Sequence, residues 1–193
     1  MMVKICGITL LADALAAVAG GAQAVGFNFY APSPRYIPPN DAADIAAALP
    51  ADIWKVGVFV DESAEAVLRT AAQVGLDVAQ LHGSEQPEQY PQGIRVWKAI
   101  RVGQAFTLPD NLPAEALLLD GPASGEVFDW TRVPRGLDKL ILAGGVHAGN
   151  VGEAIAQVHP WGVDACSQIE ASPGRKDHFK MAAFLKAALA ASR

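Results

Sequence analysis

The feature that most constrains the fold of this chain is a regular alternation of short apolar runs with alanine-rich stretches. The apolar runs end in Gly, Asp or Asn, and the stretches between them have helical spacing, a pattern typical of βα units around a parallel sheet. We count about eight such units. Strands are expected at 3–6, 24–29, 54–59, 78–81, 96–100, 116–119, 139–142 and 162–165, and helices at 11–19, 41–49, 64–74, 151–158 and 179–191.

This pattern predicts an α/β fold, a single-domain (β/α)8 TIM barrel that spans residues 1–193. The competing architecture is an open doubly wound sheet. It needs an early Gly-rich turn of the GxGxxG type, which the first strand and turn, KICGIT at 4–9, do not contain. The segment from Arg101 to Glu115 is too rich in Gly, Pro and Asn for a good helix, so the fifth helix is expected to be degenerate.

Composition excludes several function classes. A formal charge of −5 and a pI near 5.3 argue against nucleic-acid binding. The chain has no apolar stretch of about 18 residues that could span a membrane, and no signal-peptide pattern, so a cytoplasmic protein is expected. The two cysteines do not indicate a disulfide framework, and the histidines lack the spacing of a metal site.

In (β/α)8 barrels the chemistry collects at the carboxyl ends of the strands. Eight candidate site residues lie there in this sequence, and together they supply an acid, a base, a cation and a cradle for an anion. They are Cys6, Arg35, His82, Asp120, Gly144, Gly145, Asp164 and Ser167.

Three of these side chains could take part in chemistry or substrate recognition. Cys6 sits at a strand end, where neighbouring groups can shift it toward the thiolate, although a buried inert thiol is equally consistent with its position. Asp120 either faces the cleft or caps the next turn. Arg35 lies between prolines and suits bidentate recognition of a planar carboxylate, with a solvated loop residue as the alternative.

The other candidates suggest a phosphate site and supporting contacts. Gly144 and Gly145 follow the seventh expected strand, before a helix expected near Gly149, and Ser167 follows the eighth, the usual place for phosphate in a barrel. An ordinary strand-to-helix turn is the alternative. Asp164 could orient Arg35 or bind the backbone of the last loop. His82 is either a donor that faces the ligand or a strand-end histidine satisfied within the fold.

The motifs KICGIT, GFNFYAPSPRYI, VGVFV, QLHG, LLLD, FDW, LAGG and PGRKD, in that order, resemble phosphoribosylanthranilate isomerases of tryptophan biosynthesis. The resemblance runs nearly end to end. It implies an Amadori rearrangement of N-(5-phosphoribosyl)anthranilate to 1-(2-carboxyphenylamino)-1-deoxyribulose 5-phosphate, with no metal and no organic cofactor. The expected partner is therefore a small phosphoribosyl substrate, bound by a monomer or a homodimer.

The resemblance also implies a role for the main candidates. Asp120 would be the general acid that protonates the ribose ring oxygen, and Cys6, as thiolate, the general base that removes the C2′ proton. Arg35 would hold the anthranilate carboxylate. The backbone around Gly144, Gly145 and Ser167 would hold the phosphate.

The sequence departs from the family pattern in two places. The stretch between Asp120 and the FDW motif at 128–130 is shorter than usual and lacks GGTG, which leaves closure over the substrate in question. Cys166-Ser167-Gln168 stands where the family generally has Ser-Ser-Gly, so the phosphate turn could be shifted or weaker. Cys166 could also approach Cys6, or be a second packed thiol.

These departures leave two rival interpretations. One is a catalytically weakened barrel that binds a phosphoribosyl ligand. The other is an isomerase of a related phosphoribosyl amine, as in histidine biosynthesis, but that family typically uses two aspartates. Cys6 in the first strand and Arg35 for a carboxylated aromatic ring favour the anthranilate substrate.

Overall fold

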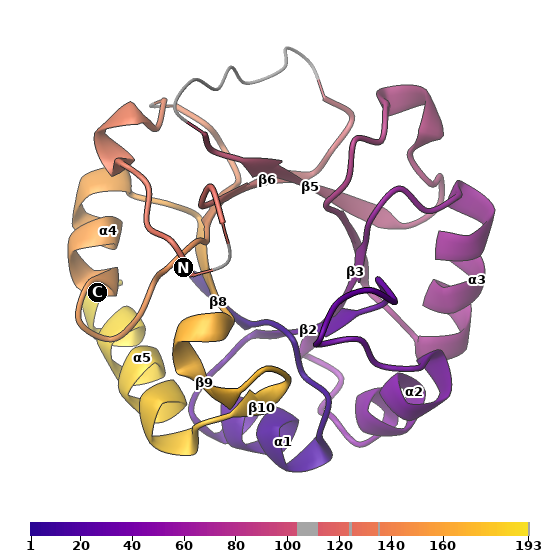
Figure 1. Ribbon diagram of the computed structural model, residues 1–193, viewed down its shortest axis with the longest axis horizontal. Helices are drawn as coiled ribbons and strands as arrows, with labels where there is room; N and C mark the ends of the chain where they lie inside the picture. Colours follow the sequence, from indigo (N-terminus) through magenta and orange to yellow (C-terminus); the bar gives the residue numbers. More distant parts are fainter. Residues whose placement is uncertain (104–111, 124, 135, 193) are drawn as a thin grey trace.

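The computed structural model describes residues 1–103, 112–123, 125–134 and 136–192. Eight parallel strands form one closed barrel in which each strand pairs with the next and the eighth returns to the first (Figure 1). The predicted (β/α)8 fold is therefore confirmed. The strands are β1 (Met2–Ile5), β2 (Ala24–Asn28), β3 (Trp54–Phe59), β4 (Val78–Leu81), β5 (Arg95–Arg101), β6 (Ala116–Asp120), β7 (Leu140–Leu142) and β8 (Gly162–Ala165).

The helices cover the outside of the barrel (Figure 1). α2 begins at Pro39, earlier than predicted, because a proline at the first helical turn has a helical φ and no amide that needs a partner. No helix in the described ranges is long and apolar enough to cross a membrane. The helices are α1 (Leu11–Ala19), α2 (Pro39–Ala47), α3 (Ala64–Val74), α4 (Val151–Val158) and α5 (His178–Ala191).

Some connections between strands have no α-helix in their described part. The short 3₁₀ helices η1 (Pro87–Gln89) and η2 (Trp130–Arg132) follow β4 and β6. The degenerate fifth helix, predicted between Arg101 and Glu115, falls mostly on residues 104–111, which lie outside the described residues. After β8 the chain forms η3 (Ser167–Ile169) and a hairpin of β9 (Glu170–Ser172) and β10 (Arg175–Lys176), which precede α5.

Side chains alternate between the inside and the outside of the barrel along each strand. In β1, Val3 and Ile5 belong to the apolar layer between the barrel and the helices. Met2 belongs to a separate cluster of interior residues, and Cys6 borders the interior cavity described below. Polar side chains at alternate positions are thus directed to the centre of the barrel.

Three tryptophans fill the end of the barrel at the amino termini of the strands. The ring of Trp97 is fully buried, with its centroid 5.8 Å from that of Trp54 and 5.9 Å from that of Trp161. Because this end is closed by side chains, an opening for ligands remains at the other end, where the carboxyl termini of the strands meet.

Replacing Trp97 with alanine should destabilise the fold strongly, because a large cavity would remain beneath the site. Substitutions of buried Phe or Trp by Ala cost about 3–5 kcal/mol. Urea unfolding measures the loss. Phe179→Ala is the matched control, because that aromatic ring is 91% exposed; it should change the free energy of unfolding by less than about 0.5 kcal/mol. Equal losses of unfolding free energy in the two variants would contradict the role given to Trp97 at the closed end of the barrel.

Candidate active site

A cavity of about 740 Å³ opens at the carboxyl ends of the strands. This volume is in the range of sites for small ligands. All eight candidates from the sequence border it, together with residues that the sequence did not single out. The eight are Cys6, Arg35, His82, Asp120, Gly144, Gly145, Asp164 and Ser167.

Cys6 lies directly after β1, which ends one residue earlier than predicted. Its amide donates to the carbonyl of Ala165 at 2.9 Å, which continues the pairing with β8 beyond the strand. The turn that follows needs Gly7, whose φ is 72°. The thiol is buried and free. Its pKa is lowered, first by a hydrogen bond from Cys166 and then, against the effect of burial, by the nearby ammonium of Lys4.

Cys166 lies beside Cys6 on the neighbouring strand end. A Cβ added at Gly7 would come within 2.9 Å of the Cys166 sulfur, so only glycine leaves room for this thiol. The hydrogen bond to Cys6 and burial both raise the pKa of Cys166. The two pKa values are thus shifted in opposite directions, and Cys6 is the more acidic thiol of the pair.

Asp120 ends β6, which β7 and β8 separate from β1 around the barrel. One carboxylate oxygen accepts from the Gly121 amide at 2.9 Å, so the residue does cap the following turn. The other oxygen lies 3.3 Å from Nε2 of His82, outside hydrogen-bond geometry. Both side chains border the cavity. The two interpretations of Asp120, a cap of the next turn and a residue facing the cleft, are thus compatible, because one oxygen caps the turn and the other is left for the cavity.

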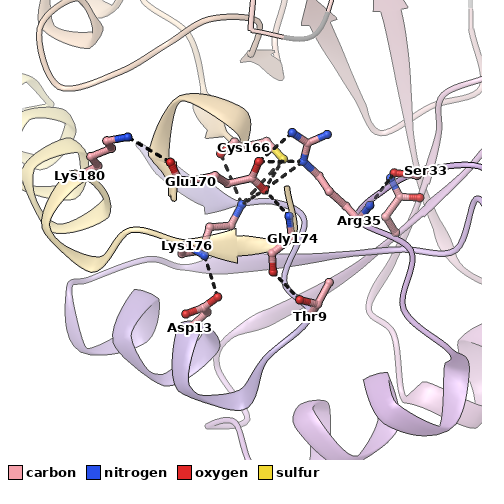
Figure 2. A network of polar contacts seen from close by, with 10 residues as sticks. Thr9, Asp13, Ser33, Arg35, Cys166, Glu170, Gly174, Lys176 and Lys180 are labelled. Atoms are coloured by element: carbon pink, nitrogen blue, oxygen red, sulfur yellow. Dashed lines mark hydrogen bonds and ion pairs between the residues drawn. The ribbon is translucent and has the colours of Figure 1, made fainter. Parts of the chain in front are cut away.

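Arg35 is held by Glu170 at the start of β9 (Figure 2). Its Nη2 donates to Oε2 at 2.7 Å and its Nε to Oε1 at 3.0 Å, which leaves Nη1 without a protein acceptor in the described part of the chain. Lys176 donates to the same carboxylate at 2.9 Å. Burial raises the pKa of Glu170, but the bonds from Arg35 and Lys176 outweigh it and hold that pKa below its usual value.

The sequence offered two roles for Asp164, to orient Arg35 or to bind the backbone of the last loop, and neither contact is observed in the described residues. Its Oδ2 accepts from the Lys4 ammonium at 2.7 Å, because the two residues are paired in the β1–β8 register. Its Oδ1 is buried and has no partner in the described residues. Burial raises the pKa of Asp164 to about 7, opposed by Lys4 and reinforced by the charge of Cys6. A buried carboxylate oxygen therefore remains for a ligand.

The glycine pair forms the opposite end of the cavity. Gly144 and Gly145 have φ values of 74° and 67°, and added Cβ atoms would collide with the backbone of Gly121 and of Val127. Neither amide donates to an acceptor within the described residues. The following helix, α4, spans Val151–Val158, as predicted. Glycine is required here by both conformation and space, and the free amides are available to an anion.

The two departures from the family pattern meet in space. Nε2 of Gln168 donates to the carbonyl of Gly125 at 2.9 Å, so the side chain points to the loop after β6. A Cβ added at Gly125 would lie 3.0 Å from Oγ of Ser167. The hydrogen bond from Gln168 thus ties the loop after β6 to the turn that carries Ser167.

Three residues at the site were not predicted. Lys4, Glu170 and Lys176 are charged but buried. Lys4 pairs with Asp164 and Glu170 pairs with Arg35, and both of these partners border the cavity. Lys176 pairs with Glu170. A signal for Lys4 was present, since it lies two positions before Cys6 and hence on the same face of the strand. Glu170 and Lys176 gave no such signal, because η3 and the hairpin bring them together.

Fold and site together define a protein of the (β/α)8-barrel class in which a thiol, a carboxyl group, a guanidinium and free amides border one cavity at the mouth of the barrel. Within the described residues, no group of three or more His, Cys, Asp or Glu side chains is placed to hold a metal ion. Residues 3–187 match the family N-(5'-phosphoribosyl)anthranilate (PRA) isomerase, and this chain belongs to that family. It is an isomerase with the activity of the family.

Individual relatives support this assignment. The N-(5'-phosphoribosyl)anthranilate isomerase of Solibacter usitatus is 50% identical over 99% of this chain and 98% of its own length. The phosphoribosyl anthranilate isomerase structure from Thermus thermophilus has a TM-score of 0.90 at 40% identity and covers 100% of both chains. A further isomerase structure, in complex with reduced 1-(o-carboxyphenylamino)-1-deoxyribulose 5-phosphate, has a TM-score of 0.87 at 40% identity, over 98% of this chain and 99% of that one.

The charged group around Glu170 predicts a loss of stability in acid. A carboxylate with a lowered pKa stabilises the fold above the pKa of the unfolded chain, about 4.3, and this contribution is lost as the pH falls through the lower folded value. Glu170→Gln should lower the free energy of unfolding at pH 7 by about 3–5 kcal/mol, because Lys176 stays buried without its counter-charge.

Urea unfolding between about pH 3 and pH 7 tests this. The loss of stability in acid should be smaller in Glu170→Gln than in the wild type. Glu65→Gln removes an exposed partner of Arg69 and is the control, with a change of at most about 0.5 kcal/mol. A Gln variant with the acid sensitivity of the wild type would contradict the role given to Glu170.

Proposed function

We propose that this chain converts N-(5-phosphoribosyl)anthranilate into 1-(2-carboxyphenylamino)-1-deoxyribulose 5-phosphate in the cavity at the barrel mouth, with Cys6 as the base and Asp120 as the acid. The observation that carries the proposal is the placement of these two groups at the ends of β1 and β6, bordering the same cavity. An aldose-to-ketose rearrangement needs two proton transfers at separate atoms of one substrate. Two groups on different strands can meet that need.

In the first step, Asp120, as the general acid, gives a proton to the ring oxygen of the ribose. The bond between C1′ and the ring oxygen breaks, and the nitrogen lone pair forms the C1′=N bond of a protonated Schiff base. The oxygen of Asp120 near His82 is the one not engaged by the Gly121 amide. His82, bordering the same cavity, is proposed as a donor to the substrate beside the acid.

In the second step, the Cys6 thiolate removes the proton from C2′. The electrons of that C–H bond form the C1′=C2′ bond of an enolamine, and the nitrogen takes back the pair of the Schiff base. Tautomerisation then gives the C2′ ketone. The lowered pKa of Cys6, which results from Cys166 and Lys4, supports this role because a base must be deprotonated at the start.

Substrate binding is proposed to use the two ends of the cavity. The free amides near Gly144 and Gly145, with Ser167, would bind the phosphate, as backbone amides at a strand-to-helix turn commonly do. The Nη1 edge of Arg35 would bind the anthranilate carboxylate, since Glu170 occupies the other edge. Oδ1 of Asp164, buried and unpaired in the described residues, would accept from a ribose hydroxyl.

The proposal also covers the oligomeric state and the cellular location of the protein. We infer a monomer or a homodimer, since the related phosphoribosylanthranilate isomerase from Thermotoga maritima is dimeric and monomers of it have been generated. A cytoplasmic location fits the two free thiols, which an oxidising compartment would put at risk.

Substitution of either catalytic group should reduce turnover far more than affinity. For Cys6→Ala and Asp120→Asn we expect kcat to fall by about 10²–10⁴-fold with KM changed by less than about threefold. A fluorescence assay for consumption of phosphoribosylanthranilate measures both constants. Lys139→Gln, at the closed end of the barrel beside Trp161, is the control and should retain wild-type constants. Near-normal turnover in either catalytic variant would refute its assignment.

Arg35→Met should raise KM for the natural substrate. Loss of a hydrogen bond between charged groups costs about 1.5–3 kcal/mol, which corresponds to roughly 10–100-fold. The sharper test measures the same two proteins with N-(5-phosphoribosyl)aniline, an analogue of the substrate that lacks the carboxylate. The wild type and the variant should use this analogue with similar constants, because nothing remains for Arg35 to bind. An equal penalty on both substrates would show that Arg35 only supports the loop.

A further inference from the structure

A fully buried lysine lies directly below the thiol of Cys6. Lys4 and Cys6 are two residues apart, so both side chains point into the barrel. Lys4 is 0% exposed. A Cβ added at Gly26 would lie 2.7 Å from the Cys6 sulfur and 3.1 Å from Cε of Lys4. Glycine at this position of β2 thus leaves one shared space for the thiol and the end of the lysine side chain.

Lys4 lies between two acidic groups and has no solvent-exposed surface. Asp164 accepts from its ammonium at 2.7 Å on one side, and Cys6 lies on the other. Burial alone would lower the pKa of Lys4, but Asp164 and Cys6 together raise it above its ordinary value. The lysine is therefore charged inside the barrel. Because the pKa of Asp164 is about 7, this carboxyl group neutralises Lys4 only in part near neutral pH.

The other charged and titratable groups around Cys6 are already engaged. The pKa of the Cys166 thiol is raised by its hydrogen bond to Cys6 and by burial. Arg35 and Lys176 both donate to Glu170, at 2.7 Å and 2.9 Å. Their positive charges are balanced by that carboxylate, whose pKa is low. Lys4 differs from these two cations because its partner, Asp164, has a pKa of about 7.

We propose that Lys4 is a positioning residue for the isomerisation, whose buried ammonium, held from one side by Asp164, keeps Cys6 in the thiolate form. Cys6 touches the substrate, and Lys4 acts only through Cys6. The inference rests on the proposed role of Cys6 as the base. It goes further in naming the group that makes a buried thiol basic at neutral pH.

The test measures the ionisation of Cys6 without turnover. In a Cys166→Ser background Cys6 is the one remaining cysteine of the two in the chain, and serine keeps a hydroxyl that can bond to it. The rate of alkylation by iodoacetamide, followed by mass spectrometry across pH, reports the thiolate. The decisive comparison is Lys4→Met/Asp164→Asn against Asp164→Asn, because it changes only Lys4 and leaves no buried carboxylate unpaired.

We expect the midpoint of the alkylation profile to lie at least about one pH unit higher in the double variant, with an alkylation rate at pH 7 about tenfold lower. Lys98→Met/Glu85→Gln is the matched control. That pair is also a buried lysine and carboxylate, with 2.5 Å between Nζ and Oε2, but it faces away from Cys6 on β5. It should lower the melting temperature and leave the midpoint unchanged.

A midpoint unmoved by loss of Lys4, in protein shown to be folded by circular dichroism, would overturn the inference. Should the double variant fail to fold, Asp164→Asn alone decides, because Lys4 then has only Cys6 to balance it. The midpoint of the alkylation profile of Asp164→Asn should equal that of the protein with Asp164 or lie below it. A higher midpoint would equally overturn the inference. Normal alkylation profiles in a wild-type protein without isomerase activity would instead count against the proposed function.

Discussion

The closed register of the barrel is the constraint on which the rest of the structure depends. Because β1 pairs with both β2 and β8, alternate residues of every strand must share one narrow interior. At the closed end that interior is filled by Trp97 and its apolar neighbours. At the open end the same alternation lines the cavity with polar groups such as Cys6 and Asp120. One geometric rule thus separates the part that stabilises the fold from the part that can bind a ligand.

The buried ion pair between these two parts is difficult to explain by stability alone. Moving a lysine and a carboxylate into the interior costs several kcal/mol for each ion, and an apolar pair of similar volume is often at least as stable. Lys4 and Asp164 also leave one carboxylate oxygen unpaired. Such an arrangement is better explained by the roles proposed for the pair in the adjoining cavity, where Lys4 acts on the thiol and Asp164 accepts from the substrate.

Sequence alone could predict whatever follows from local pattern. The alternating runs predicted the barrel, and the position of each strand end placed Cys6, Asp120 and the glycine pair around one cavity. The partner of Arg35 could not be predicted in this way. Asp164 was the nearest candidate in the last strand, but its in-register neighbour is Lys4, and Glu170 reaches Arg35 only because η3 and the hairpin turn the chain back. Contacts set by irregular segments need the structure.

The two departures from the family pattern are better understood together than singly. The loop after Asp120 lies next to the turn that carries Ser167, and a glycine at position 168 would have no side chain to join them. Gln168 joins the two segments by a hydrogen bond to the carbonyl of Gly125. Since the glutamine side chain points to the loop, the amides near Gly144 and Gly145 remain accessible from the cavity. Glutamine at position 168 is therefore compatible with the proposed phosphate site, because its side chain is bonded to the opposing loop.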